Sequence, residues 1–410
     1  LLDEPTTGLD PEARALFKIE AEQVTPAELI KILLKSRVDL LFFGGIGTYV
    51  RASGETNAEV GDRANDALRV DGRMLRCKVV AEGGNLGLTH LGRIEYALAG
   101  GRINTDAIDN SAGVDCSDHE VNIKILLDAA VREGELTLKQ RNRLLAGMTD
   151  EVAALVLRDN VFQTQSLSVA GRVAPQLLEQ QARFIRALER AGRLNRAIEF
   201  LPADDELAER KSARLGLTAP ERAVLLAYAK MQVYEELLAS DIPDEPTLAA
   251  ALERYFPKPL RARFARHIQA HPLRREIIAT HVTNSMVNRV GSTFVHRMRE
   301  ETGASTAEVV RAYMVTREAY GLVAFWQQVE ALEPKVPDPV QSAMLLDAGR
   351  LIVRATLWLL RNRKHLAEVA AAIAHFRPGV EALEALLPDA LAASARQAYD
   401  EAKARYGEAG

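Results

Sequence analysis

The chain has few of the features that mark several large classes of protein. Only two cysteines, Cys77 and Cys116, occur among 410 residues, and their spacing is neither metal-like nor redox-like. We expect both to be small core residues in a reducing, cytoplasmic setting. Lysine and arginine (52) nearly balance aspartate and glutamate (56), and the formal net charge is -4. This balance predicts neither a nucleic-acid nor a membrane partner. No apolar run approaches the roughly 18 residues of a membrane-spanning helix, and no signal-peptide pattern begins the chain.

Two glycine-rich phosphate-binding patterns are also missing. The chain has no GxxxxGK[ST] loop, and no GxGxxG follows a strand and begins a helix. The string from Leu2 to Asp10 nevertheless matches the catalytic-glutamate segment of ABC-transporter ATPases. Without the phosphate loop, and with only Leu1 and Leu2 before Asp3, we interpret this string as accidental. ATP hydrolysis is kept as a third hypothesis, and we expect residues 1–10 to be poorly ordered.

Residues 11–135 alternate between strand-like and helix-like segments. Apolar runs predict buried parallel strands at 38–43, 77–81 and 102–104. Helices are predicted from Thr25, over 57–67, over 88–98, and from about Ser117 onward. This alternation is typical of a doubly wound, Rossmann-like parallel sheet, of which these residues would be the distal half.

Residues 136–410 lose the strand signal. Long segments rich in Ala, Leu, Arg and Glu have helical periodicity and are interrupted by prolines. They predict a helical domain larger than the α/β remnant, including one long helix through 284–293. We interpret the polar residues of that helix, and those around Asp159, Asn160, Gln163 and Gln165, as helix–helix contacts in preference to a ligand site.

Small and amide residues follow the predicted strands. Gly44 and Gly45 follow the first strand, the sequence Glu-Gly-Gly-Asn ending at Asn85 follows the second, and Asn110 begins the segment after the third. Parallel sheets bind ligands at the carboxyl ends of their strands. Asparagine can bind a ribose or a carboxamide without adding charge. The sequence therefore predicts a ligand crevice there.

The histidines give weaker signals. His267 and His271 have ligand-like spacing on a predicted helix, but no glutamate lies between them, so a surface or capping role is favoured. The run of residues 118–120 (Asp-His-Glu) fits a substrate-orienting or proton-shuttling role and a helix start equally well. We assign no metal ligand.

The polar loops resemble those of glutamate dehydrogenases, which have EGAN after one strand and NAGGV-x-x-S before a helix. Residues 82–85 match the first string with Gly for Ala, and residues 110–117 match the second in spacing. The strings at 42–50, 61–66 and 108–120 are closer still to the large bacterial NAD-specific glutamate dehydrogenases. The resemblance runs from about residue 10 almost to the end, so the chain resembles their C-terminal part.

The resemblance implies NAD as cofactor and L-glutamate, converted to 2-oxoglutarate and ammonia, as substrate. Asn85 would face the nicotinamide ribose, Asn110 would hold the carboxamide or the substrate, and Ser117 would bind a substrate carboxylate. Gly44 and Gly45 would let the cofactor pass. A homo-oligomeric full-length protein is also implied.

The family's catalytic lysine and aspartate lie upstream of the region matched here, so no catalytic residue is assigned. We expect the chain by itself to be inactive. The alternative is a non-catalytic oligomerisation or regulatory module, favoured by the excess of predicted helix over sheet.

Overall fold

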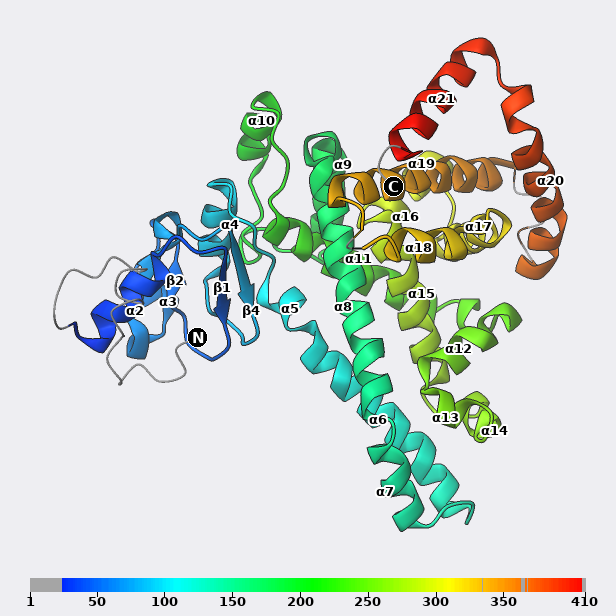
Figure 1. Cartoon of the computed structure of the whole chain (residues 1–410), viewed down its shortest axis with the longest axis horizontal. Helices are drawn as coiled ribbons and strands as arrows, with labels where there is room; N and C mark the ends of the chain where they lie inside the picture. Colours follow the sequence, from blue (N-terminus) through cyan, green and yellow to red (C-terminus); the bar gives the residue numbers. More distant parts are fainter. Residues whose placement is uncertain (1–23, 334, 363–365, 367, 408–410) are drawn as a thin grey trace.

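The computed structural model describes residues 24–333, 335–362, 366 and 368–407. An α/β part lies at one end of the molecule, and a larger helical part occupies the rest (Figure 1). Short parallel strands followed by a mostly helical region confirm the predicted fold class. The ATPase-like string and the expected disorder of residues 1–10 fall outside the described residues. None of the described helices is long and apolar enough to cross a bilayer.

Short parallel ladders build the α/β part. β1 (Leu40–Phe43) pairs with β4 (Val79–Glu82), which confirms both predicted strands. β2 (Val50–Arg51) pairs with β3 (Val70–Asp71). The predicted strand at 102–104 is reduced to one parallel bridge between Arg102 and Val79.

One face of β1 is solvent-exposed. Leu40 is 55% and Phe42 62% exposed, whereas Phe43 is buried. The prediction that this strand is buried is therefore wrong for one of its two faces. Its apolar run indicates a strand but does not show how many faces the remaining structure covers.

The helices of the α/β part begin at side-chain caps. Thr25 and Glu28 form the predicted capping box of α2 (Pro26–Leu34). Thr89 caps α4 (His90–Leu98), close to the predicted helix. The predicted helix over 57–67 is wrong in its length: α3 (Asn57–Val60) stops at Gly61, whose φ is +76°, and a 3₁₀ turn (Arg63–Asn65) follows. The left-handed conformation at glycine ends the helix.

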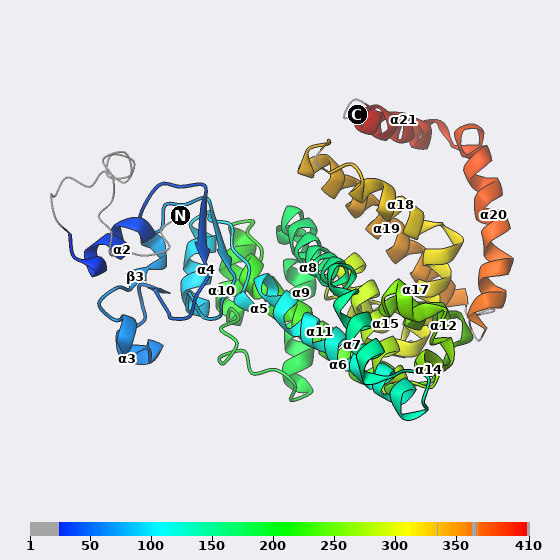
Figure 2. The same ribbon diagram turned by 60° about the horizontal axis from the view of Figure 1, so that its bottom comes forward.

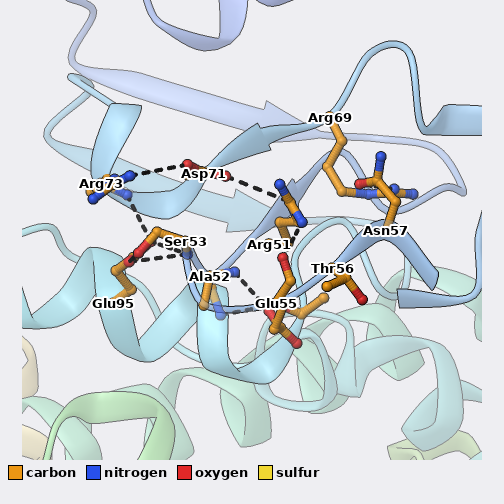
Figure 3. Close-up of polar contacts among 12 residues, drawn as sticks. Arg51, Ala52, Ser53, Glu55, Thr56, Asn57, Arg69, Asp71, Arg73 and Glu95 are labelled. Atoms are coloured by element: carbon orange, nitrogen blue, oxygen red, sulfur yellow. Dashed lines mark hydrogen bonds and ion pairs between the residues drawn. The ribbon is translucent and has the colours of Figure 1, made fainter. Parts of the chain in front are cut away.

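Polar contacts tie the β2–β3 pair to α4 (Figure 3). Arg51 lies 3.5 Å from Asp71 across the ladder. The Glu95 carboxylate of α4 accepts from the backbone N–H groups of Ser53 and Arg73, each at 3.1 Å. The Glu95 carboxylate thus orients both loops that follow these strands.

The helical part starts with α5 (Asp106–Asp109) and the long α6 (Ser111–Arg132). The helices that follow are α7 (Leu138–Ala146), α8 (Thr149–Arg172), α9 (Ala174–Arg190), α10 (Asp204–Ser212), α11 (Ala219–Leu238), α12 (Ala249–Tyr255), α13 (Lys258–Arg261), α14 (Ala265–Gln269), α15 (Arg274–Val290), α16 (Phe294–Thr302), α17 (Thr306–Ala319), α18 (Leu322–Glu330), α19 (Asp338–Asn362), α20 (Val369–Ala390) and α21 (Ala393–Gly407). Short 3₁₀ turns occupy Gly72–Met74, Ile242–Asp244 and Pro246–Leu248. α6 and α8 run side by side in both views (Figures 1 and 2).

Two predicted helix boundaries are wrong. α6 begins at Ser111 and not near Ser117, because Asn160 of α8 donates to Ile108 O and Ser111 Oγ, both at 2.8 Å, and holds the first turn. The predicted long helix through 284–293 is interrupted at Gly291, whose φ is +84°. That conformation favours glycine and ends α15 before α16 begins.

The two parts have separate apolar cores. The α/β core includes Val50, Leu88 and Tyr96, and the helical core includes Leu225 and Phe264. Cys77 is buried, as predicted. Cys116 is exposed on α6, so its prediction as a core residue is wrong.

Candidate functional site

The carboxyl ends of β1 and β4 lie at one edge of the sheet, because these strands are parallel and in register. The N–H groups of Gly83 and Gly84 both donate to Phe43 O, at 2.8 and 3.2 Å. A Cβ atom on Gly84 would lie 2.3 Å from Gly45 O. Only glycine therefore lets the two loops approach this closely, which explains the glycine where the resembled string has alanine.

A buried ion pair anchors the second loop. Arg93 of α4 donates to both carboxylate oxygens of Glu82, at 2.8 and 3.0 Å, and both side chains are almost completely buried. Glu82 Oε1 also accepts from the N–H groups of Gly87 and Leu88 at 2.8 and 3.3 Å. One carboxylate thus positions the whole turn between β4 and α4.

Two aspartates of α5 complete the support. Asp109 accepts from the Glu82 N–H at 3.1 Å, and Asp106 accepts from the Leu86 N–H at 2.9 Å. Leu86 has a φ of +60°, a conformation that a leucine adopts only when its surroundings impose it. Burial raises the pKa of Asp109. The sequence analysis missed Asp106 and Asp109. Asp106 is the first residue of α5, and the Thr105 cap before it was the available signal.

The two predicted asparagines meet at this edge. Asn110 Nδ2 donates to Asn85 Oδ1 at 3.2 Å. Gly45 belongs to the same assembly through its contact with Gly84, and Gly44 and Gly45 are both exposed. The structure therefore brings together the four residues predicted to bind the cofactor.

Ser117 does not lie at the start of its helix, where the sequence predicted it. It occupies the second turn of α6, where its hydroxyl donates to Gly113 O at 3.3 Å. Ser117 therefore does not lie at the N-terminus of α6, where free backbone N–H groups would favour an anion. Its side chain is exposed, on the same face of α6 as the exposed Val114 and Val121.

The opposite face of α6 lines a cavity of about 700 Å³ within the helical part. Asp118 and Asn122 both contact the Tyr255 hydroxyl, at 2.7 and 2.8 Å, and His119 stacks on the Tyr255 ring with 4.4 Å between centroids. Residues 118–120 lie inside α6, so their predicted helix-start role is wrong.

Burial perturbs several groups in and beside this cavity. It raises the pKa of Asp115 to about 6, with the charges of Asp159 and Asp118 adding to the effect. It lowers the pKa of Lys230 to about 8 and that of His281 to about 4. The sequence analysis missed Asp115, Lys230 and His281. For Asp115, its spacing of four from His119 would have signalled a shared face if the start of α6 had been placed correctly.

Some polar residues of the predicted helices make helix–helix contacts, and others line the cavity. Gln163 accepts from Lys230 and Gln165 accepts from Arg289, both at 3.0 Å, which confirms helix–helix contacts for these two. Asp159 and Asn288 line the cavity.

His267 and His271 are both buried, so a surface role is wrong. His271 Nδ1 accepts from the Leu273 N–H at 3.1 Å, directly before α15 begins at Arg274.

Comparison with known proteins matches nearly the whole chain to one family. Residues 4–170 match the family described as "Bacterial NAD-glutamate dehydrogenase, catalytic domain", and residues 214–410 match "Glutamate dehydrogenase, C-terminal". The NAD-specific glutamate dehydrogenase of Halomonas elongata is 50% identical over 92% of the chain, and that of Pseudomonas aeruginosa is 49% identical over 98%. The protein of that name from Mycobacterium tuberculosis is 45% identical over 92%. The chain spans only 23–25% of the length of these relatives.

Proposed function

The chain belongs to the family of bacterial NAD-specific glutamate dehydrogenases, and on this basis we propose that it supplies the nicotinamide-side half of their active site. The reaction would be the NAD-dependent oxidative deamination of L-glutamate to 2-oxoglutarate and ammonia. Because the chain spans about a quarter of its relatives' length, the remaining groups of the site would come from other parts of a longer protein.

The contact between Asn85 and Asn110 carries this proposal. Asn110 Nδ2 donates to Asn85 Oδ1, so the Asn85 amide N–H₂ and Asn110 Oδ1 remain without a hydrogen-bond partner among the described residues. A donor and an acceptor thus lie side by side at the strand ends. This pair complements a nicotinamide carboxamide, which offers one acceptor and one donor, or the two hydroxyls of a ribose.

The glycines of the first loop support the same function. A Cβ atom on Gly45 would meet no other atom within 4 Å, so packing within the described chain does not require glycine there. Close passage of a cofactor would require it, because a side chain would occupy the space next to the asparagines. Gly44, also exposed, would contribute to the same passage.

The residues of this chain would bind and orient, and the cofactor would supply the chemistry by accepting a hydride. Asn85 and Asn110 would hold the nicotinamide side. Ser117, exposed about two turns after Asn110 on α6, would donate its hydroxyl to a substrate carboxylate. We assign no proton-transfer group to the chain, and the isolated chain would therefore not turn over. Homo-oligomeric assembly remains a prediction from the resemblance, and a cytoplasmic location remains a prediction from the low cysteine content.

Binding of NADH to the 410-residue chain tests the cofactor half of this proposal. Titration calorimetry should detect binding, and Asn110→Ala should weaken it about tenfold, as expected for the loss of one or two hydrogen bonds in a partly exposed site. The matched control is Asn142→Ala, an exposed asparagine on α7, which should bind as the unmodified chain does. Equal affinity of the Asn110 and Asn142 variants would remove Asn110 from the site.

A second assay tests the division of labour. Glutamate-dependent reduction of NAD by the isolated chain should be undetectable. Measurable turnover would show that the proton-transfer groups lie within these 410 residues.

A further inference from the structure

A cluster of three possible metal ligands lies on the face of α6 that points away from Asn110 and Ser117. Asp115 and His119 are four residues apart and therefore share one face of α6, and Asp159 comes from the neighbouring α8. One ligand atom from each residue lies within 4.8 Å of the other two. The long helices α6 and α8 pack directly against each other and thus bring the three ligand atoms close together.

The imidazole of this cluster is buried and one of its nitrogens has no hydrogen bond. His119 is only 2% exposed, and its Nδ1 atom has no hydrogen-bond partner among the described residues. The Oδ2 atom of Asp115 is also buried and has no hydrogen-bond partner in the described part of the chain. Buried polar groups are almost always satisfied, so two orphans in one cluster indicate a missing ligand. Stacking on Tyr255 holds the His119 ring plane in place.

The nearby cations do not satisfy the cluster directly. Lys230 Nζ donates to Gln163 at 3.0 Å and makes no ion pair with Asp115 or Asp159 in the described part of the chain. Arg158 lies 3.9 Å from Asp159, at the limit of an ion pair, and its side chain is about half exposed. Neither cation donates a hydrogen bond to Asp115 or Asp159 in the described part of the chain, so the carboxylate oxygens remain available to a small cation.

We propose that Asp115, His119 and Asp159 bind one divalent transition-metal ion, Zn²⁺ or Mn²⁺. Two carboxylate oxygens and one imidazole nitrogen form a donor set that both ions accept. Three protein ligands leave coordination positions open toward the 700 Å³ cavity that these residues line. This site is separate from the proposed cofactor site and does not depend on it.

The ion would fasten α6 to α8 close to the start of α6. Asn160, the residue after Asp159, already donates to Ile108 O and Ser111 Oγ, next to Asn110. The consequence would be structural: metal binding would stabilise the packing of the helix that carries Asn110 and Ser117. Unfolding as well as binding therefore reports on the site.

The test is titration of the chelator-treated, dialysed 410-residue chain with ZnCl₂ and with MnCl₂. Calorimetry should give about one equivalent of at least one of these ions. That ion should raise the midpoint of thermal unfolding. His119→Gln and Asp159→Asn should each weaken binding at least tenfold and abolish the shift. Glu120→Gln is the matched control, since Glu120 is the exposed neighbour of His119 and pairs with Lys124 instead.

One further variant, His267→Gln, and the nearly isosteric Asp159→Asn keep the experiment decisive. His267 forms a second cluster of possible metal ligands with the exposed Glu133 and Glu135. His267→Gln removes one ligand of that cluster and should leave binding of the metal ion unchanged. Asp159→Asn is nearly isosteric and remains informative if the His119 variant does not fold. The absence of stoichiometric binding of either ion would overturn the proposal, as would unchanged binding in Asp159→Asn or loss of binding only in His267→Gln.

Discussion

The α/β part and the helical part of this chain differ in how much of their order comes from apolar packing, although both contain a buried ion pair, Glu82–Arg93 in the first and Arg210–Glu221 in the second. The helical part packs large apolar side chains with no exposure, including Phe256, Phe264 and Ile268. The α/β part has a small apolar core, and buried charged residues position its loops: Glu82 and Arg93 at the strand ends, and Arg69 beside β2. Apolar packing stabilises regular elements, but irregular loops contain backbone groups outside the helix and sheet ladders, and polar side chains satisfy many of them. The proposed cofactor site is built from such loops.

The largest effect is expected from a cavity in the helical core. Phe264→Ala should lower the free energy of unfolding by about 3–5 kcal/mol, because a fully buried ring is lost and the cavity collapses only partly. Urea unfolding followed by tryptophan fluorescence measures this, since Trp326 and Trp358 both belong to helical segments, α18 and α19. Leu157→Ala is the control, as Leu157 is 61% exposed and should cost no more than about 0.5 kcal/mol.

Breaking the buried ion pair is the corresponding experiment in the α/β part. Arg93→Met leaves the Glu82 charge buried and should cost about 3 kcal/mol. Hydrogen exchange at the β1 and β4 amides should accelerate, while the tryptophan transition stays unchanged. Lys78→Met removes an exposed pair with Asp39 and should have little effect. The urea midpoint of the tryptophan transition could instead fall together with the exchange protection of the strand amides. The two parts would then unfold as one unit, and the difference in their packing would not give them separate stabilities.

A pair of glycine substitutions separates packing from binding at the strand ends. Gly84→Ala should destabilise the α/β part by about 1–3 kcal/mol, because its methyl group would collide with Gly45 O. Gly45→Ala should leave stability nearly unchanged, because its methyl group meets nothing within 4 Å, yet it should weaken NADH binding. Thermal unfolding and calorimetry on both variants measure this. Equal NADH affinity in Gly45→Ala and the parent would contradict the proposed passage of the cofactor.

The smallest expected effect concerns pH in the helical part. Burial and the nearby Arg317, Arg254 and Arg158 lower the pKa of His281 to about 4. The unfolded chain, with a histidine pKa of about 6.5, therefore binds more protons between these values, and the native state loses stability as pH falls through this range. Relative to His281→Gln, the parent should lose on the order of 1 kcal/mol between pH 7 and pH 4, after allowance for partial solvent access. Parallel stability curves for the two proteins would show that His281 does not contribute.

Local residue patterns predicted much of this structure, and neighbours from distant segments decided the rest. Thr25 and Glu28 form a cap from four consecutive residues, so the start of α2 was predictable. The convergence of Asn85 and Asn110 followed from parallel strand order. The start of α6 was not predictable, because its first turn reads as a loop and is held by Asn160, some 49 residues after Ser111. Without that start, the shared face of Asp115 and His119 could not be recognised.

The sequence by itself determined the element types, the polar strand ends and the family, because these depend on short-range propensities and on ordered motifs. Only the tertiary structure decided that one face of β1 is exposed, that Gly84 must be glycine, that Cys116 is exposed, and that His119 Nδ1 is buried with no hydrogen bond from the described residues. Each of these depends on which distant backbone or side chain approaches within a few ångströms. No local pattern specifies that distance, because it results from packing the whole chain at once.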